Sequence, residues 1–289
     1  MAIPTTHNRY IREKSQFERP IFKWAGGKFS VLQEVSKHLP HGARLIEPFV
    51  GGGSVFTNAG YKDNLLNDVN PDLINFYQVL SSQGTTLIEL AQEFFCDHNN
   101  AKGYLDIREK FNNQEYTSLE RAAAFLYLNR HCYNGLTRYN LAGGFNVGYG
   151  KFKHPLFPTE ALFSFLFAQC TSTRTFMRGD FENVVNMAGA SDVVFCDPPY
   201  EPLPDTMGFT SYSGTPFLFD SQERLTAALV AAHARGAKIV ITNSGAPLIR
   251  SLYLDNGFTI HQLPTRRSVS CKSQTRNTAF DIIATLGAK

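Results

Sequence analysis

Short strand-like segments alternate with helical patterns along most of this chain, and this alternation constrains the fold more than any other feature. Seven short segments are strand candidates: 43–47, 64–68, 174–178, 192–197, 237–243, 258–263 and 279–284. Six more have apolar residues at helical spacing: 31–39, 72–80, 105–111, 119–129, 221–234 and 247–255. Strands that alternate with helices pair in parallel, so the sequence predicts an α/β fold with a mostly parallel sheet.

The strand pattern pauses between about Asp72 and Leu166. This stretch begins helical and becomes rich in Asn, Gly and Tyr at 129–150. We interpret it as an insertion of residues 71–165, with helices and a β-hairpin, into a sheet domain formed by residues 1–70 and 166–289.

A glycine-rich turn follows the first predicted strand, in Leu45–Ser54, and Asp68 ends the next strand 21 residues after Glu47. In a doubly wound sheet, glycines let the backbone approach a nucleotide and a carboxylate at the second strand tip binds ribose hydroxyls. The spacing is not GxGxxG, which disfavours a dinucleotide. The carboxylate at Glu47 favours a cationic ligand, and S-adenosylmethionine would fit.

The segment Lys23–Lys28 contains Gly-Gly-Lys but does not match a phosphate-binding P-loop. That loop requires GxxxxGK followed by Ser or Thr, whereas Phe29 follows Lys28 here. We therefore disfavour a nucleoside triphosphatase.

The apolar run Val193–Cys196 leads into Asp197, Pro198, Pro199 and Tyr200. Asp197 thus lies at the carboxyl tip of a predicted central strand, where open α/β sheets bind ligands. Its carboxylate and the Pro198 carbonyl could hold the two N–H groups of an exocyclic amine, with its lone pair facing a methyl donor. Transfer would then depend on positioning and electrostatics, without a metal. Tyr200 offers a ring on which an extruded base could stack.

Charge and cysteine content exclude some classes of protein. A net charge of +3 is too small to indicate nucleic acid by itself. The five cysteines are widely spaced and lack a CxxC or Cys/His ligand pattern, which argues against zinc and a disulfide framework. The polar N-terminus lacks a signal-type apolar core, and no run is long enough to span a bilayer. We expect a cytoplasmic, nucleoid-associated protein with no membrane, metal or obligate protein partner.

The chain resembles the Dam type of DNA adenine methyltransferase, whose best-known members act on GATC. The resemblance covers about residues 22–283. Its motifs are KWAGGK at 23–28, EPFVGGGS at 47–54, NDVN at 67–70, LYLNR at 126–130, YNGLTRYN at 133–140, GFNV at 144–147 and DPPY at 197–200. DPPY alone is shared by several amino-methyltransferase groups, whereas the ordered set is specific.

The resemblance implies a seven-stranded Rossmann-like methyltransferase sheet, with residues 71–165 as a target-recognition domain. The predicted catalytic residues are Asp197, Pro198 and Tyr200. The predicted S-adenosylmethionine site comprises Trp24, Lys28, Glu47, Phe49, Gly51, Ser54, Asp68, Asp180 and Asp197. The predicted contacts to double-stranded DNA are Lys23, Arg108, Tyr133, Asn134, Leu136, Arg138, Asn140, Asn146 and Lys151. In the family, residues matching Tyr133 and Asn134 enter the DNA stack, and those matching Leu136 and Arg138 read the far end of the site. Gly148 stands where a relative has a proline beside a base.

Basic and aromatic side chains also alternate along the insertion, as expected where basic groups bind DNA phosphates and aromatic rings stack on bases. Residues 201–217 are predicted to act as a lid. The basic residues Arg266, Arg267, Lys272 and Arg276 form a second basic group, which is either a nucleic-acid contact or an ordinary exposed loop. Two rival interpretations remain: methyl transfer to an RNA base or a side-chain amide, and a DNA-binding regulator without catalysis.

Overall fold

The computed structural model describes residues 17–200, 217–263 and 280–287. These residues contain a seven-stranded sheet with the order β3-β2-β1-β4-β5-β7-β6. Its strands are β1 (Arg44–Glu47), β2 (Asp63–Asp68), β3 (Thr173–Arg178), β4 (Asp192–Cys196), β5 (Lys238–Ser244), β6 (Thr259–Leu263) and β7 (Asp281–Leu286). Strands β1 to β5 pair in parallel, and β7 lies antiparallel between β5 and β6. The predicted seven-stranded, mostly parallel sheet is confirmed.

The bounds of β1 to β6 agree with the sequence prediction to within one residue, but the last strand was placed two residues too early, at 279–284. The structure has it at Asp281–Leu286 because β7 pairs along its whole length with two neighbours. Leu286 pairs with Ile239 of β5 at one end, and Asp281 pairs with Leu263 of β6 at the other. Apolar content alone does not show where such a ladder ends.

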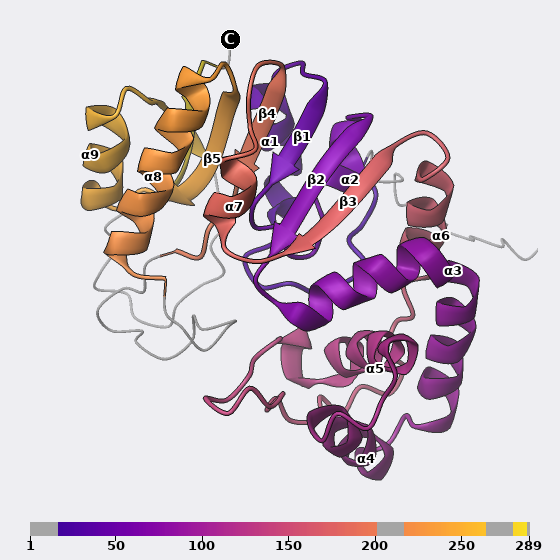
Figure 1. The fold of residues 1–289 in the computed structure, drawn as a ribbon. Helices are drawn as coiled ribbons and strands as arrows, with labels where there is room; N and C mark the ends of the chain where they lie inside the picture. The colour runs from indigo at the N-terminus through magenta and orange to yellow at the C-terminus, as the bar shows by residue number, and fades with distance from the viewer. Residues whose placement is uncertain (1–16, 201–216, 264–279, 288–289) are drawn as a thin grey trace, which may run out of the picture.

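The helices surround the sheet and fill the insertion (Figure 1). They are η1 (Lys28–Val31), α1 (Leu32–His38), α2 (Phe56–Ala59), α3 (Pro71–Asp97), α4 (Ala101–Asn112), α5 (Ser118–His131), η2 (Tyr133–Gly135), α6 (Thr159–Ala168), α7 (Phe181–Val185), α8 (Phe219–Ala234) and α9 (Pro247–Asp255). All six predicted helices are present, whereas α2, α6 and α7 were not predicted. Helix α3 extends far beyond the predicted 72–80, with a kink at Gln83 where the backbone leaves helical geometry. Gly84, next to the kink, packs against Leu166.

The inserted helices begin at clear capping signals. The Asn70 side chain accepts hydrogen bonds from the backbone N–H groups of Asp72 and Leu73, and Pro71 occupies the first turn of α3. Helix α5 begins with a capping box between Thr117 and Glu120. One hydrophobic core joins these helices to the sheet, since Phe22 packs against both Phe76 and Phe125.

The predicted hairpin is present as two isolated antiparallel bridges, Cys132 with Tyr149 and Tyr139 with Phe145, and not as a ladder of strands. Part of the hairpin backbone forms hydrogen bonds to a side chain, that of Asn112, and not to a partner strand. The Asn112 amide accepts from the N–H of Phe145 and donates to its carbonyl. The hairpin is therefore held against α4.

The arrows of β1 and β2 point toward α3 and α5 (Figure 1). The carboxyl ends of these strands thus face helices α3 and α5. Those helices belong to residues 71–165, the predicted target-recognition domain. Among the described residues, no helix is long and apolar enough to cross a membrane.

Candidate active site

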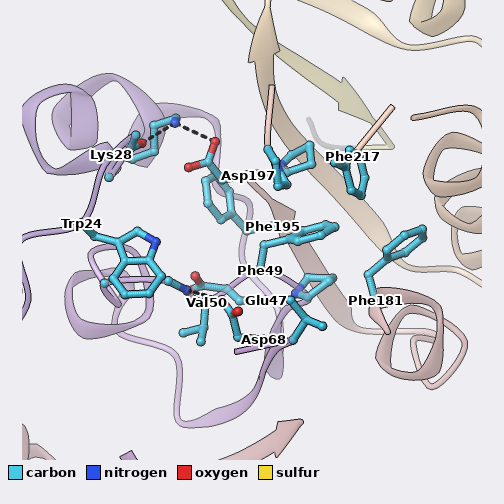
Figure 2. Close-up of a pocket in the computed structure, with 18 of the residues that line it drawn as sticks. Trp24, Lys28, Glu47, Phe49, Val50, Asp68, Phe181, Phe195, Asp197 and Phe217 are labelled. Atoms are coloured by element: carbon cyan, nitrogen blue, oxygen red, sulfur yellow. Dashed lines mark hydrogen bonds and ion pairs between the residues drawn. The ribbon is translucent and has the colours of Figure 1, made fainter. Parts of the chain in front are cut away.

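A cavity of about 640 Å³ opens at the carboxyl ends of β1, β2 and β4. This volume lies within the usual range for small-molecule sites, roughly 300–1,000 Å³. Every residue predicted for catalysis or for the cofactor lines it: Trp24, Lys28, Glu47, Phe49, Gly51, Ser54, Asp68, Asp180, Asp197, Pro198 and Tyr200. Figure 2 shows most of these side chains grouped around one space. The structure brings these residues together, and their individual roles stay predictions.

Asp197 follows the last residue of β4 and is held by two donors on one oxygen. Lys28 Nζ lies 2.6 Å from Asp197 Oδ1 (Figure 2). The Thr242 hydroxyl donates to the same oxygen at 2.8 Å. Lys28 also donates to the Gly26 carbonyl at 2.7 Å, which fixes its ammonium group. Burial raises the pKa of Asp197, while Lys28 and Thr242 oppose that rise. The geometry leaves Oδ2 as the oxygen for another donor.

Glu47 and Asp68 bring two further carboxyl groups to the cavity. Glu47 is buried, its Oε1 atom has no hydrogen-bond partner, and burial raises its pKa well above the usual range. Asp68 accepts backbone N–H groups from Gly51 and Asn70, each at 3.0 Å. Burial still raises the pKa of Asp68. Both groups favour a cationic or hydrogen-donating ligand, because such a ligand would compensate for their desolvation.

The glycine turn lies directly against Trp24. Gly51 has a φ of +47°, and a Cβ atom there would lie 2.7 Å from Trp24 Nε1. At Gly52 an added Cβ would lie 2.9 Å from Trp24 Cβ. Any larger residue would displace the indole, so these glycines allow the backbone and Trp24 to form one wall of the cavity.

An aromatic wall on the other side was not predicted in full. Phe49 packs against Phe181 and Phe217, with ring centroids 5.5 and 5.7 Å apart. Arg224 also lines the cavity and forms an ion pair with Asp180, which caps α7. Phe181, Phe217, Arg224 and Thr242 come from segments without a motif. Of these four, only Thr242 could have been found from the sequence, because it lies near the carboxyl end of β5, the strand that pairs with β4.

The loop after Asp197 is fixed at its second proline. Gln222 donates to the Pro199 carbonyl at 3.1 Å. The Lys28 ammonium lies 5.0 Å from the centroid of the Tyr200 ring. The Pro198 carbonyl remains the predicted second acceptor for an amine, because the Pro199 carbonyl is engaged.

The predicted DNA contacts lie outside this cavity, mostly in residues 132–149, the hairpin segment that the Cys132–Tyr149 bridge closes. Tyr133 is 58% exposed, and Asn134, also exposed, has a positive φ of 54°. Arg138 Nε donates to Asn146 Oδ1 at 2.8 Å, so two predicted contacts support each other. The Asn140 side chain accepts from Gly144 N–H and shapes the hairpin tip, where Leu141 is 96% exposed. No motif or spacing pointed to Leu141 as an exposed residue.

The remaining predicted contacts differ in how they are held. Arg108 is half-buried and donates to the Val147 carbonyl at 3.0 Å. Leu136 is half-buried and packs against the core, whereas Lys151 is exposed with a φ of +56°. Lys23 Nζ lies over the Phe152 ring at 4.3 Å, and burial lowers the Lys23 pKa. Gly148 faces open space, so the position that carries a proline in a relative has room for a larger residue.

Two predictions fall outside the described residues: all of the lid except Phe217, and the basic group Arg266, Arg267, Lys272 and Arg276. In the part of the chain that the structure describes, no group of three or more His, Cys, Asp or Glu side chains could hold a metal ion.

The family model and the relatives that this chain matches all point to one family of proteins. Residues 24–269 match the family model of the D12 class N6 adenine-specific DNA methyltransferases. The chain is 59% identical over 281 residues to a DNA N-6-adenine-methyltransferase of Escherichia phage P1, a match that covers 97% of this chain and 37% of the phage protein. It is 40% identical to a DNA adenine methylase of Vibrio cholerae, covering 92% of this chain and 95% of that protein. For the DNA adenine methylase of Escherichia coli K12 the identity is 38%, with 92% and 94% covered.

Among solved structures, the rRNA methyltransferase aviRa of Streptomyces viridochromogenes aligns over 89% of this chain and 83% of its own, at 15% identity and a TM-score of 0.32. A likeness at this level supports no argument about function. The family model covers most of the chain, and it agrees with relatives matched over nearly their whole length. The chain therefore belongs to the D12 class of N6 adenine-specific DNA methyltransferases.

Proposed function

We propose that this protein transfers a methyl group from S-adenosylmethionine to the N6 amine of an adenine flipped out of duplex DNA, within the sequence GATC. The observation that carries the proposal is the position of Asp197. Its carboxylate stands at the tip of β4, bound on one oxygen by Lys28 and Thr242, at the edge of the cavity. The family membership and the relatives named DNA adenine methylase support adenine in DNA as the acceptor.

The residues around the cavity fit S-adenosylmethionine. The buried Glu47 Oε1 atom lacks a partner and could accept from an ammonium group, while Asp68 could accept from ribose hydroxyls. Phe49, Phe181 and Phe217 provide aromatic surfaces for a purine. When bound, the cofactor would supply an activated methyl group on a sulfonium.

Asp197 and Pro198 would orient the target amine. The Asp197 Oδ2 atom accepts one N–H of the adenine and the Pro198 carbonyl accepts the other, so that the nitrogen lone pair faces the methyl donor. Because Oδ1 is fixed by two donors, the carboxylate is already oriented before the base arrives. The Tyr200 ring stacks on the extruded base.

The exposed hairpin segment would bind the duplex. Tyr133 and Asn134 occupy the space that the flipped adenine leaves, and the Arg138 fork reads a guanine. The protein would then act on chromosomal DNA in the cytoplasm, at the nucleoid. A regulator without catalysis would not need the ion pair that Lys28 forms with Asp197.

Expression in cells that lack DNA methylation tests the proposal. We expect N6-methyladenine at GATC throughout the genome, and none with Asp197→Ala, although that variant should still fold and bind duplex DNA. Transfer of labelled methyl groups to purified DNA, RNA and protein identifies the acceptor. Methylation confined to RNA or protein, or activity of Asp197→Ala within about tenfold of the wild type, would contradict the proposal.

A further inference from the structure

The motif LYLNR at residues 126–130 contains a fully buried amide, Asn129, near the carboxyl end of α5. Asn129 Oδ1 accepts from the Lys23 backbone N–H at 3.0 Å, and its Nδ2 donates to the Lys23 carbonyl at 2.8 Å. A single amide thus satisfies both backbone groups of Lys23, a residue 106 positions away in the chain.

The same Nδ2 atom reaches the turn that carries Tyr133 and Asn134. It lies 3.2 Å from the Thr137 hydroxyl and 3.3 Å from the Gly135 carbonyl. Gly135 itself packs on the Lys23 side chain, since an added Cβ would lie 2.5 Å from Lys23 Cβ. Residues 135–137 and Lys23 are therefore held together through Asn129.

Lys23 immediately precedes the segment that borders the cofactor cavity. Trp24 lies against the glycine turn at Gly51, and Lys28 holds Asp197 at 2.6 Å. A displacement of residues 133–137 would have to break the Asn129 hydrogen bonds or move Lys23 with them. Packed, hydrogen-bonded groups move together because an unpaired buried polar group is costly.

We propose that Asn129 is a positioning residue that couples DNA binding at the Tyr133–Thr137 turn to cofactor binding at Trp24–Lys28. The inference rests on the proposed function, because it needs both ligands. Duplex DNA that orders the turn would, through Asn129, set the position of Trp24 and Lys28. By linkage, the cofactor would change DNA affinity by the same factor.

Trp24 is the only tryptophan in the sequence, so its fluorescence reports the coupling directly. The affinity of S-adenosylhomocysteine is measured by this signal, with and without a GATC duplex. For the wild type we expect at least about a fivefold change in affinity when DNA is present. Asn129→Leu removes all the bonds of the amide at similar size, and we expect it to reduce the change to about twofold or less while each ligand still binds alone.

Two further variants control the experiment. Asn64→Leu removes another buried amide, which bonds to the Tyr61 and Thr173 carbonyls at the far end of β2, and it should keep the wild-type coupling. Thr137→Val removes one acceptor on the turn and should lower the coupling at least about twofold. This variant tests the role of Asn129 even if Asn129→Leu does not fold.

Unchanged coupling in Asn129→Leu or Thr137→Val, or an equal loss in Asn64→Leu, would overturn the inference. A wild-type protein that binds both ligands without coupling would overturn it too and leave the proposed function standing. A wild-type protein that binds neither DNA nor S-adenosylhomocysteine would refute the proposed function itself.

Discussion

Lys28 is the cation that most strongly opposes the rise in the Asp197 pKa. Burial favours the protonated carboxyl, and a protonated Asp197 accepts hydrogen bonds poorly. Activity should therefore be present above the pKa of Asp197 and fall as the pH drops through it. The ion pair at 2.6 Å keeps that pKa lower than burial alone would allow.

Lys28→Met should move the acidic limb of the pH profile of kcat/KM to higher pH. The substitution removes the largest influence that lowers the Asp197 pKa, so the carboxyl takes up its proton earlier. The control is Lys37→Met, which removes an exposed lysine far from the cavity. An acidic limb at the same pH in Lys28→Met as in the wild type would show that Lys28 does not control Asp197.

Arg138 and Lys151 should differ in the pattern of their effects. The bond from Arg138 Nε to Asn146 leaves the two terminal nitrogens of the guanidinium for O6 and N7 of a guanine. We expect Arg138→Ala to lose roughly tenfold to a hundredfold on the cognate duplex. The loss should be much smaller on duplexes already changed at that base pair.

Lys151→Ala should instead weaken all duplexes alike and reduce the salt slope of binding by about one. Methylation of duplexes with single base-pair changes, at two salt concentrations, separates the two patterns. A uniform loss for Arg138→Ala would make it a backbone contact, and specificity would have to lie elsewhere in the hairpin segment.

The first turn of helix α3 lies between the cavity and the hairpin segment, which carries most of the predicted DNA contacts. Asn70 caps the helix directly after Val69, which lines the cavity beside Asp68. Two residues later, the buried Asp72 carboxylate accepts from Arg121 at 2.7 Å and from the Tyr139 hydroxyl at 2.7 Å. One carboxylate thus joins α3, α5 and the hairpin segment.

Asp72→Ala should lower the free energy of unfolding by about 3 kcal/mol, because it removes the buried carboxylate that accepts from both Arg121 Nε and the Tyr139 hydroxyl. Urea denaturation measures this change. The matched control is Glu34→Ala, which breaks the exposed ion pair with Lys37 and should have little effect. Equal effects of the two substitutions would show that the Asp72 network does not stabilise the fold.

The cavity draws its lining from segments throughout the chain, from Trp24 to Arg224, and three of its carboxyl groups have raised pKa values. An acid with a higher pKa in the folded state destabilises the fold increasingly as the pH rises above its unfolded pKa. These three carboxyl groups therefore lower the stability of the free protein, and they lie at the site where we propose that a cationic cofactor binds.

Glu47→Gln should therefore stabilise the free protein at neutral pH and weaken S-adenosylhomocysteine binding. The amide keeps an acceptor for the Phe56 backbone N–H but carries no charge to desolvate. The stability gain should disappear as the pH falls toward the ordinary pKa of a glutamate. Thermal unfolding at pH 5 and pH 7, with and without ligand, measures both effects. A variant that is less stable than the wild type at pH 7 would contradict this account of Glu47.

The sequence by itself predicted the strands, six of the helices and one end of the site. Apolar periodicity located every strand of the described sheet, and the motifs at Glu47–Ser54, Asp68 and Asp197–Tyr200 placed the carboxylates at strand tips. These inferences succeed because a parallel sheet brings the carboxyl ends of its strands to one edge, so order along the chain already indicates proximity.

Only the tertiary structure decided the rest. The bond between Thr242 and Asp197, the packing of Phe181 and Phe217 against Phe49, and the hydrogen bonds of Asn129 to Lys23 join residues that local patterns do not relate. The end of β7 was also decided by its partners, the paired strands β5 and β6. Packing contacts depend on which surfaces come together in the folded protein. The secondary-structure propensity of one segment does not indicate which other segment it will contact.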